Sequence, residues 1–308
     1  MVVVLAGGVG GARFIEGVVQ VVPPEQVTAV VNTGDDFTLY GLAISPDVDI
    51  VTCTLAGLID PAMGWGIAGD TDECMGMLTR LGGPSWFKLG DRDLALHIRR
   101  TELLRAGLTP TQIAEQFRVA LGCPVRILPM SDEHVETHIL TEAGQMHFEQ
   151  YLVERRAQDA VLGVVFEGVD EAKPAPGLLD AIAQAEAVLI APSNPLVSVG
   201  TILAVPGVRA AIEQARDRVV AVSPIVGGAA IKGPAAPLMR AQGYEVSALG
   251  VAQCYRGLVG TMVIDQVDAA LADPIRALGM DVVVADTIMR DAAAKRQLAL
   301  AALGAVAA

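Results

Sequence analysis

The sequence has little positive charge and few aromatic residues. Its 308 residues include 22 Lys and Arg against 35 Asp and Glu, which gives a formal net charge of −13, and only 4% are aromatic. Affinity for a nucleic acid comes mainly from basic side chains that neutralise phosphates, so this composition argues against nucleic-acid binding. Phosphate groups must instead be bound locally, by backbone N–H groups, a few cations or a divalent metal held by carboxylates.

Cysteines and long apolar runs are also scarce. The four cysteines, Cys53, Cys74, Cys123 and Cys254, include no C-x-x-C pair, so they resemble neither a zinc site nor a disulfide framework. Reduced cysteines are typical of a cytoplasmic protein. No basic segment precedes an apolar run at the start, and the apolar run at 298–308 is too short to span ~30 Å of hydrocarbon. We therefore expect a cytoplasmic protein that does not enter a membrane.

Hydrophobic residues, in contrast, make up 52% of the chain, and their pattern predicts strands that alternate with helices. This alternation predicts an α/β fold with a doubly wound, mainly parallel, Rossmann-like sheet. Because no obvious linker divides the chain, we expect a single α/β domain over residues 1–308. The expected strands are residues 2–6, 27–31, 160–165, 187–191, 219–222, 246–249, 259–264 and 282–285.

The stretch 86–158 departs from this alternation, and we expect it to form an inserted helical and hairpin subregion. Asp91 is expected to cap a helix. Residues 109–112, Thr-Pro-Thr-Gln, have the form of a capping box with proline at the first helical position, which predicts a second helix. The alternating segments 134–140 and 146–153 flank a Thr-Glu-Ala-Gly turn and predict a β-hairpin.

A glycine-rich turn, Gly-Gly-Val-Gly-Gly, follows the first expected strand at residues 7–11. Glycines there allow positive φ and close backbone approach, and the helix expected after them, at 14–22, offers N–H groups and a positive dipole end to a phosphate. Arg13 stands where a dinucleotide fingerprint has its third glycine, and no Gly-Lys-Ser/Thr follows for a P-loop. We therefore expect this turn to bind an anion through Gly7, Gly8, Gly10, Gly11 and Arg13.

Four carboxylates lie in two short acidic segments that follow the second expected strand. Asp35 and Asp36 belong to Asn-Thr-Gly-Asp-Asp, and Asp47 and Asp49 belong to Ser-Pro-Asp-Val-Asp. Ligands of an open α/β sheet bind at the carboxyl ends of its strands, and Mg²⁺ prefers carboxylate and phosphate oxygens. The sequence therefore predicts a magnesium site that includes Asp35 or Asp36 together with Asp49.

Two further turns follow expected strands and present polar groups without charge. One is Pro-Ser-Asn-Pro, with Ser193 and Asn194, and the other is Ser-Pro-Ile-Val-Gly-Gly at 223–228. Hydroxyl and N–H groups in such turns bind anions. We expect both turns at the same edge of the sheet as the glycine turn.

Histidines raise the question of a zinc site. His134 and His138 are four residues apart, and His147 lies across the expected hairpin. On a strand, His134 and His138 share one face but are about two pleats apart at ~3.4 Å per residue, which is too far to chelate one ion well. The spacing therefore argues against zinc held by these two histidines.

Long motifs of the chain resemble the 2-phospho-L-lactate transferase family of coenzyme F(420) biosynthesis. They occur in the family's order and cover nearly the whole chain. The clearest are AGGVGGARF, VVNTGDD, ISPDVD, WFKLGDRDLALHIRR, APSNPLVSVGTILAVPGVR and SPIVGGAAIKGPAAPLM.

The resemblance implies a Mg²⁺-dependent transferase with two small-molecule substrates, and a homodimer. One substrate is the deazaflavin 7,8-didemethyl-8-hydroxy-5-deazariboflavin. The other is a guanosine diphosphate ester of lactate or enolpyruvate, whose distal phosphorus is attacked by the ribityl hydroxyl as GMP leaves. Such a transfer needs positioning and charge neutralisation more than covalent help from the protein.

The resemblance also implies roles for individual residues. Asp49 and Lys88 are expected to contact the deazaflavin, and Asp49 or Asp36 is expected to act in catalysis. Asp91 and Arg92, like Ser193 and Asn194, are expected to make further ligand contacts. The general base is not assigned.

Two other functions remain open from the sequence. One is an NAD(P)-dependent oxidoreductase on the same type of sheet, and the other is a nucleotide-binding regulator that lacks a deazaflavin site. The sequence also leaves open whether the acid is phospholactate, phosphoenolpyruvate or phosphoglycerate, since these differ by very few contacts.

Overall fold

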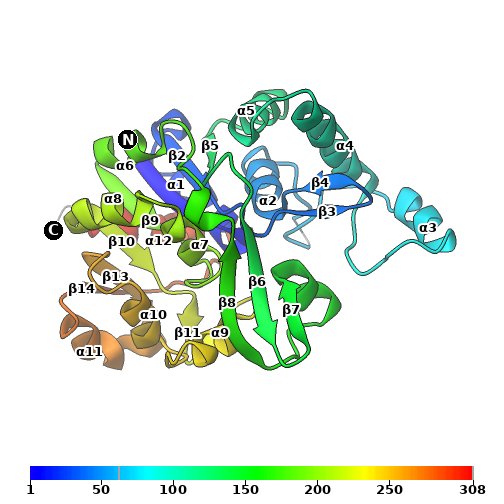
Figure 1. Cartoon of the computed structure of the whole chain (residues 1–308). Helices are drawn as coiled ribbons and strands as arrows, with labels where there is room; N and C mark the ends of the chain where they lie inside the picture. The colour runs from blue at the N-terminus through cyan, green and yellow to red at the C-terminus, as the bar shows by residue number, and fades with distance from the viewer. Residues whose placement is uncertain (62, 307–308) are drawn as a thin grey trace.

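The computed structural model describes residues 1–61 and 63–306, and its centre is a seven-stranded sheet in which every pair of neighbouring strands is parallel (Figure 1). The mainly parallel α/β fold expected from the sequence is confirmed. In spatial order the sheet contains β14 (Asp281–Ala285), β13 (Thr261–Asp265), β10 (Val219–Val222), β9 (Ala187–Ile190), β1 (Val2–Ala6), β2 (Val27–Val31) and β5 (Arg126–Pro129).

Helices cover both faces of this sheet, because its central strands are apolar and buried along their whole length. One face packs against α1 (Gly8–Val18), α2 (Pro46–Leu55), α5 (Pro110–Ala120) and α12 (Ala292–Gly304). The other packs against α6 (Leu178–Gln184), α7 (Val199–Ala204), α8 (Val208–Gln214), α9 (Ala235–Ala241), α10 (Ala248–Cys254) and α11 (Ala272–Arg276).

Between β2 and β5 the chain makes a long excursion, in which α2 and α5 pack against the sheet and the remainder extends away from it. The excursion contains the hairpin of β3 (Phe37–Leu39) and β4 (Leu42–Ile44), then α2, α3 (Glu73–Arg80), α4 (Asp91–Arg105) and α5. Its β3, β4, α3 and α4 share a small apolar core that is separate from the cores under the sheet. We call the β3–β4 hairpin together with residues 56–61 and 63–105, which contain α3 and α4, the arm, and Figure 1 shows α3 at its far end. The predicted capping box forms at the start of α5, where Thr109 Oγ1 accepts a hydrogen bond from the Gln112 N–H.

A second, antiparallel sheet contains β7 (Gly144–His147), β6 (Glu136–Thr141) and β8 (Val161–Glu167) in that order. The predicted hairpin is confirmed as β6 and β7, but its second strand ends at His147, before the predicted end at residue 153, and a π-helix follows over Gln150–Glu154. The prediction that residues 160–165 join the parallel sheet is wrong, because β8 pairs with β6. Leu162 is 60% exposed. This exposure is typical of a strand with one face in solvent, whereas a strand in a sheet covered on both faces is buried.

Two other local predictions are corrected. Residues 246–249 were expected to form a strand, but α10 begins at Ala248, where Ser247 Oγ accepts a hydrogen bond from the Gly250 N–H. Asp91 was expected to cap α4, but it is the first residue of that helix. The first turn of α4 is capped instead by Asp70, which accepts hydrogen bonds from the N–H groups of Arg92 and Asp93.

The strand order reverses at β1, and this reversal determines where a ligand site is expected on the sheet. From β1 the chain adds β2 and β5 on one side, then β9, β10, β13 and β14 on the other. At such a switch point the loops after adjacent strands turn to opposite faces and leave a crevice outside the carboxyl ends of the strands.

Candidate functional site

A cavity of about 720 Å³ opens at this switch point, outside the carboxyl ends of β1, β9 and β10. We call the lining from the glycine turn, the first turn of α2 and the loops after β9 and β10 the inner wall, and the lining from the arm the arm wall. Its volume is in the range of sites for drug-sized ligands. The turns at 192–194 and 223–224 line the cavity together with the glycine turn, as the sequence predicted.

The glycine turn is shorter than expected, because α1 begins at Gly8 and not at residue 14. Gly8 has φ +64°, a conformation that favours glycine. The Gly7 N–H donates to Ser193 Oγ at 3.1 Å, and the Gly8 N–H donates to Asp47 Oδ1 at 2.7 Å. Side chains of the protein thus already hold the first two N–H groups that the sequence assigned to a bound anion.

The other glycines of the turn have different neighbours. A Cβ on Gly10 would lie 2.9 Å from the Pro192 carbonyl oxygen, so only glycine lets the helix approach the loop after β9 this closely. Gly11 is buried against Ala6 and does not line the cavity. Arg13 lines it, and its guanidinium donates to the Met289 carbonyl oxygen.

Asp47 occupies the N-terminus of α1, where the sequence predicted a bound phosphate. It also accepts a hydrogen bond from Asn32 Nδ2 at 3.0 Å. Burial raises the pKa of Asp47 to about 6, although the bonds from Asn32 and Gly8 oppose this shift. The same helix dipole that attracts a phosphate stabilises this carboxylate. The pairing could not be predicted, because Asp47 and Gly8 are far apart in the chain.

Two carboxylate oxygens at the cavity are buried and accept no hydrogen bond from the described residues. They are Asp35 Oδ1 and Asp49 Oδ2. Burial raises the pKa of Asp35 well above its ordinary value, and the negative charges of Asp47 and Glu149 raise it further. A buried, unpartnered carboxylate oxygen is costly, so each of these two atoms is a candidate acceptor for a cation or a hydroxyl at the cavity.

Asp49 is held from behind by Arg100, whose guanidinium donates to Asp49 Oδ1. Arg100 is itself buried, lies 5.5 Å from the centre of the Phe117 ring, and donates to the Ala43 carbonyl oxygen at 3.3 Å. His97 Nδ1 lies 3.6 Å from Asp49 Oδ2, and burial lowers the pKa of His97 to about 4, so this imidazole is neutral at pH 7. Arg100 therefore supplies the positive charge that fixes Asp49.

Asp36 does not reach this cavity. It lines a neighbouring cavity of about 400 Å³, and both of its carboxylate oxygens lie 2.8 Å from Ser45 Oγ, which donates to them. Of the two adjacent aspartates that the sequence offered for a metal, the structure brings Asp35 to the main cavity. Asp49 lines both cavities.

Glu149 is a further acid of the cavity that sequence reasoning did not identify. It lies just after β7, 7% exposed, and its N–H donates to His147 Nδ1 at 3.1 Å. Burial, and then the charge of Asp47, raise the pKa of Glu149 to about 8. The sequence analysis placed Glu149 within a strand over 146–153. In the structure β7 ends at His147, and Glu149 follows it at the cavity.

The arm wall presents apolar and aromatic side chains to the cavity. Its side chains include Trp65, which is 45% exposed, and Ile67 and Phe87. Lys88 lines the same wall. Trp65 was not selected from the sequence, because its loop has no recognisable motif beyond its glycines.

Asp91 and Arg92 do not line the cavity. Asp91 accepts a hydrogen bond from the Cys74 N–H at 3.0 Å and so fixes the start of α3. Arg92 donates to the Ala68 carbonyl oxygen at 2.6 Å. Both residues stabilise the loops of the arm, where the sequence expected them to contact a ligand.

Positive charges stand around the cavity although the protein is strongly acidic. Arg13 and Lys88, which the sequence analysis named, line the cavity. So do two cations that it did not identify: Lys232, which follows β12, and Arg290, which is paired with Asp286. β12 (Ala229–Ala230) and β11 (Ile225–Val226) form a small hairpin after β10. The cavity therefore combines four cations, buried carboxylates and an aromatic wall, which suits an anionic ligand and a flat one at the same time.

No helix in residues 1–61 and 63–306 is both long and apolar enough to cross a membrane.

The family model described as 2-phospho-L-lactate transferase CofD matches residues 2–302. A phosphoenolpyruvate transferase from Streptomyces griseus is 44% identical over 308 residues, covering 98% of this chain and 97% of its own. A 2-phospho-L-lactate transferase from Methanothermobacter thermautotrophicus is 42% identical over 305 residues, covering 99% and 97%.

Among solved structures, the chain is similar to a protein of the UPF0052 family from Bacillus halodurans. The two superpose with a TM-score of 0.67 at 18% identity, over 98% of both chains. This likeness supports the α/β architecture.

Proposed function

Because the chain belongs to the 2-phospho-L-lactate transferase CofD family, we propose that it transfers 2-phospho-L-lactate or phosphoenolpyruvate from a guanosine diphosphate ester to 7,8-didemethyl-8-hydroxy-5-deazariboflavin. The ribityl hydroxyl of the deazaflavin attacks the distal phosphorus, and GMP leaves. The observation that carries the proposal is that one cavity is lined both by buried carboxylates with unpartnered oxygens and by aromatic side chains of the arm.

The guanylylated acid binds along the inner wall in this proposal. Val9 and Gly10 lie in the first turn of α1, where helix N–H groups have no acceptor within the helix. Arg13, Lys232 and Arg290 add positive charge around the diphosphate. The N–H groups of Gly7 and Gly8 do not take part, because Ser193 and Asp47 already accept from them.

The deazaflavin lies against the arm in this proposal. Trp65 and Phe87 offer ring faces and edges for its tricyclic ring, and Lys88 stands beside them. This orientation directs the ribityl chain toward Asp49 on the inner wall. With Oδ1 fixed by Arg100, Asp49 Oδ2 orients the attacking hydroxyl and accepts its hydrogen bond.

The residues at the cavity fit a magnesium ion. Asp35 Oδ1 and Asp49 Oδ2 are unpartnered and buried, and hard oxygen donors of this kind are the ligands that Mg²⁺ prefers. When bound there with the diphosphate, Mg²⁺ supplies charge neutralisation to the transferring phosphoryl group. Asp36 does not join this ligand set, since Ser45 holds its carboxylate in the neighbouring cavity.

The test is release of GMP, measured by chromatography, from each guanylylated acid with the deazaflavin and Mg²⁺. We expect GMP release that requires both the deazaflavin and the metal, and parallel assays with the lactate and enolpyruvate esters identify the acid. Binding of nucleotide and deazaflavin without turnover of either ester would contradict the proposal. Binding of nucleotide without deazaflavin would favour a regulator instead.

The homodimer implied by the resemblance and the cytoplasmic location expected from the composition are part of this proposal. Exposed apolar side chains on neighbouring helices of the arm, Met77 and Leu81 in or next to α3 and Ile98 in α4, offer a surface for a second copy. Light scattering coupled to size-exclusion chromatography measures the mass in solution, and a monomer at all concentrations would contradict the dimer.

A further inference from the structure

Outside the cavity, two glutamates of the small antiparallel sheet face each other directly. Glu136 on β6 is the register partner of Glu167 on β8, so their side chains leave the same face of the sheet. Neither residue lines the main cavity. Like charges at directly opposed positions of an antiparallel pair are destabilising, so this arrangement calls for a cation between them.

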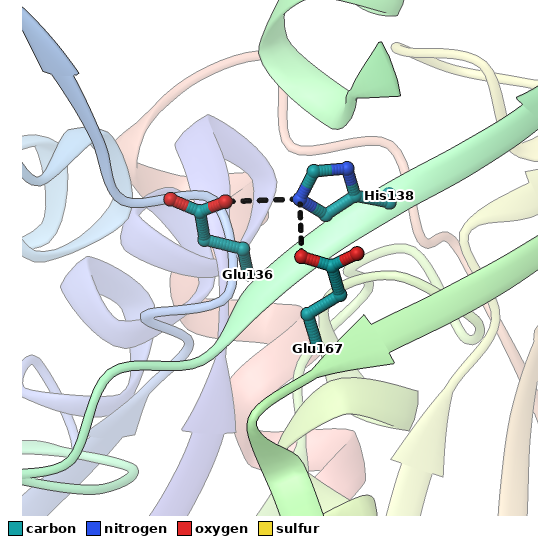
Figure 2. Close-up of side chains that lie close together, drawn as sticks. All are labelled: Glu136, His138 and Glu167. Carbon is teal, nitrogen blue, oxygen red and sulfur yellow. Dashed lines mark hydrogen bonds and ion pairs between the residues drawn. The ribbon is translucent and has the colours of Figure 1, made fainter. Parts of the chain in front are cut away.

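A histidine, His138, lies next to both glutamates. His138 is two residues along β6 from Glu136, on the same face, and Figure 2 shows dashed lines from one of its ring nitrogens to both carboxylates. His138 Nε2 lies 2.9 Å from Glu136 Oε2 and 3.4 Å from Glu167 Oε2. Among the described residues, these three are the group whose ligand atoms all lie within 4.8 Å of one another.

The separations match the coordination shell of a transition metal. Four donors at ~2.0–2.1 Å from a tetrahedral ion lie about 3.3–3.4 Å from one another. The observed 2.9 and 3.4 Å therefore leave room for one ion with small adjustments of the glutamate side chains. A protonated imidazole would supply one positive charge to two carboxylates, whereas a divalent ion would neutralise both.

We propose that Glu136, His138 and Glu167 form a binding site for a divalent transition-metal ion of the zinc class, which links β6 to β8. An imidazole nitrogen among the ligands favours Zn²⁺ over Mg²⁺, and this distinguishes the site from the all-oxygen set at the cavity. His134 lies outside this group, because its Nε2 pairs with the other carboxylate oxygen of Glu136, Oε1, at 3.0 Å.

The proposal agrees with the sequence in one respect and extends it in another. The spacing of His134 and His138 argued against an ion chelated by those two histidines. The structure inserts Glu136 between them and adds Glu167 from a neighbouring strand, which no spacing along the chain could reveal.

The experiment measures Zn²⁺ binding by the whole protein without substrates. The protein carries Cys74→Ser, because Cys74 is an exposed free thiol that would bind zinc by itself. After treatment with a chelator, Zn²⁺ is titrated against a chromophoric competitor in excess Mg²⁺, which occupies the carboxylates of the cavity. We expect one Zn²⁺ per chain, and at least about tenfold weaker binding in Glu167→Gln and in His138→Gln.

The matched control is Glu142→Gln, which removes one exposed carboxylate from the turn between β6 and β7. It should bind Zn²⁺ like the parent, and Zn²⁺ should raise the Tm of the parent and of Glu142→Gln but not that of Glu167→Gln. Circular dichroism verifies that each variant is folded, and Glu167 is half exposed, so its substitution leaves the fold intact. Absence of stoichiometric binding, or equal binding by Glu167→Gln and Glu142→Gln, would overturn the proposal. Because no substrate is present, either result leaves the transferase proposal untouched.

Discussion

The two walls of the main cavity are built in opposite ways. The inner wall belongs to the sheet edge and to α2, and its polar groups are buried and bonded to one another across long distances in the sequence, as Asp47 is to Gly8 and Asn32. The arm wall is formed by the arm, whose Trp65 is 45% exposed and whose small apolar core is separate from the main ones.

This difference indicates that the inner wall carries the residues for the chemical step and the arm wall carries those for ligand binding. On the inner wall the protein satisfies almost every buried polar atom and leaves Asp35 Oδ1 and Asp49 Oδ2 without partners, so a change there alters both charge and structure. On the arm wall the protein offers mainly apolar surface, so a change there alters contact area. Substitutions on the inner wall should therefore have the larger effects.

Asp49→Asn should have the largest effect. It removes the charge at the unpartnered oxygen but keeps the size of the side chain, so we expect GMP release to fall by about 10²-fold or more with the fold intact. The measurement is kcat for GMP release at saturating substrates, with circular dichroism as the check on folding. The control is Asp72→Asn, an exposed aspartate of the arm. Near-normal turnover in Asp49→Asn would remove this residue from the mechanism.

Arg100→Met should have the next largest effect, on stability. It leaves the Asp49 carboxylate, whose side chain is 15% exposed, without its cationic partner. Removing one member of a buried ion pair costs about 3–5 kcal/mol. The double variant Arg100→Met with Asp49→Asn should lose less free energy of unfolding than the sum of the single variants, because no unpaired charge remains. Strict additivity in denaturant unfolding would show that the pair does not act as a unit.

The sequence predicted the sheet well because its signal is local. Val2–Ala6 and Val27–Val31 are continuous apolar runs, and each forms a strand that is buried on both faces. Residues 160–165 gave a similar signal and were misassigned, because the hydrophobic pattern does not reveal the partner strand. That partner, β6, is contributed by the hairpin before it.

The site was predicted in part, for the same reason. Motifs near the strand ends led correctly to the edge where Asp35, Asp49 and Ser193 gather. Glu149 was missed because its burial depends on how the small sheet docks. The choice between Asp35 and Asp36 was equally beyond the sequence, since it depends on the contact with Ser45.

Glu149→Gln should have a smaller effect, visible as a change in the pH dependence of stability. Burial and the charge of Asp47 raise the pKa of Glu149 from an ordinary 4.5 to about 8 in the folded protein. Because the folded pKa is the higher one, the stabilising contribution is complete below pH 4.5 and is lost as the pH rises through about 8. In a chelator, the free energy of unfolding of the parent should fall by up to about 1.4 kcal/mol per pH unit more steeply than that of Glu149→Gln. Parallel curves, with Glu142→Gln as the charge control, would contradict the burial of an ionisable group here.

Trp65→Ala should have the smallest effect and tests the arm wall alone. Stacking of a flat ring on an aromatic side chain is worth about 1–3 kcal/mol, so KM for the deazaflavin should rise by about tenfold or more while kcat stays near the parent value. Since the indole is 45% exposed, the free energy of unfolding should change by no more than about 0.5 kcal/mol. Trp65→Phe should restore most of the affinity, because the phenyl ring keeps a face for stacking. A fall in kcat as large as that of Asp49→Asn, without a change in KM, would show that the arm takes part in the chemical step and would break the division between the two walls.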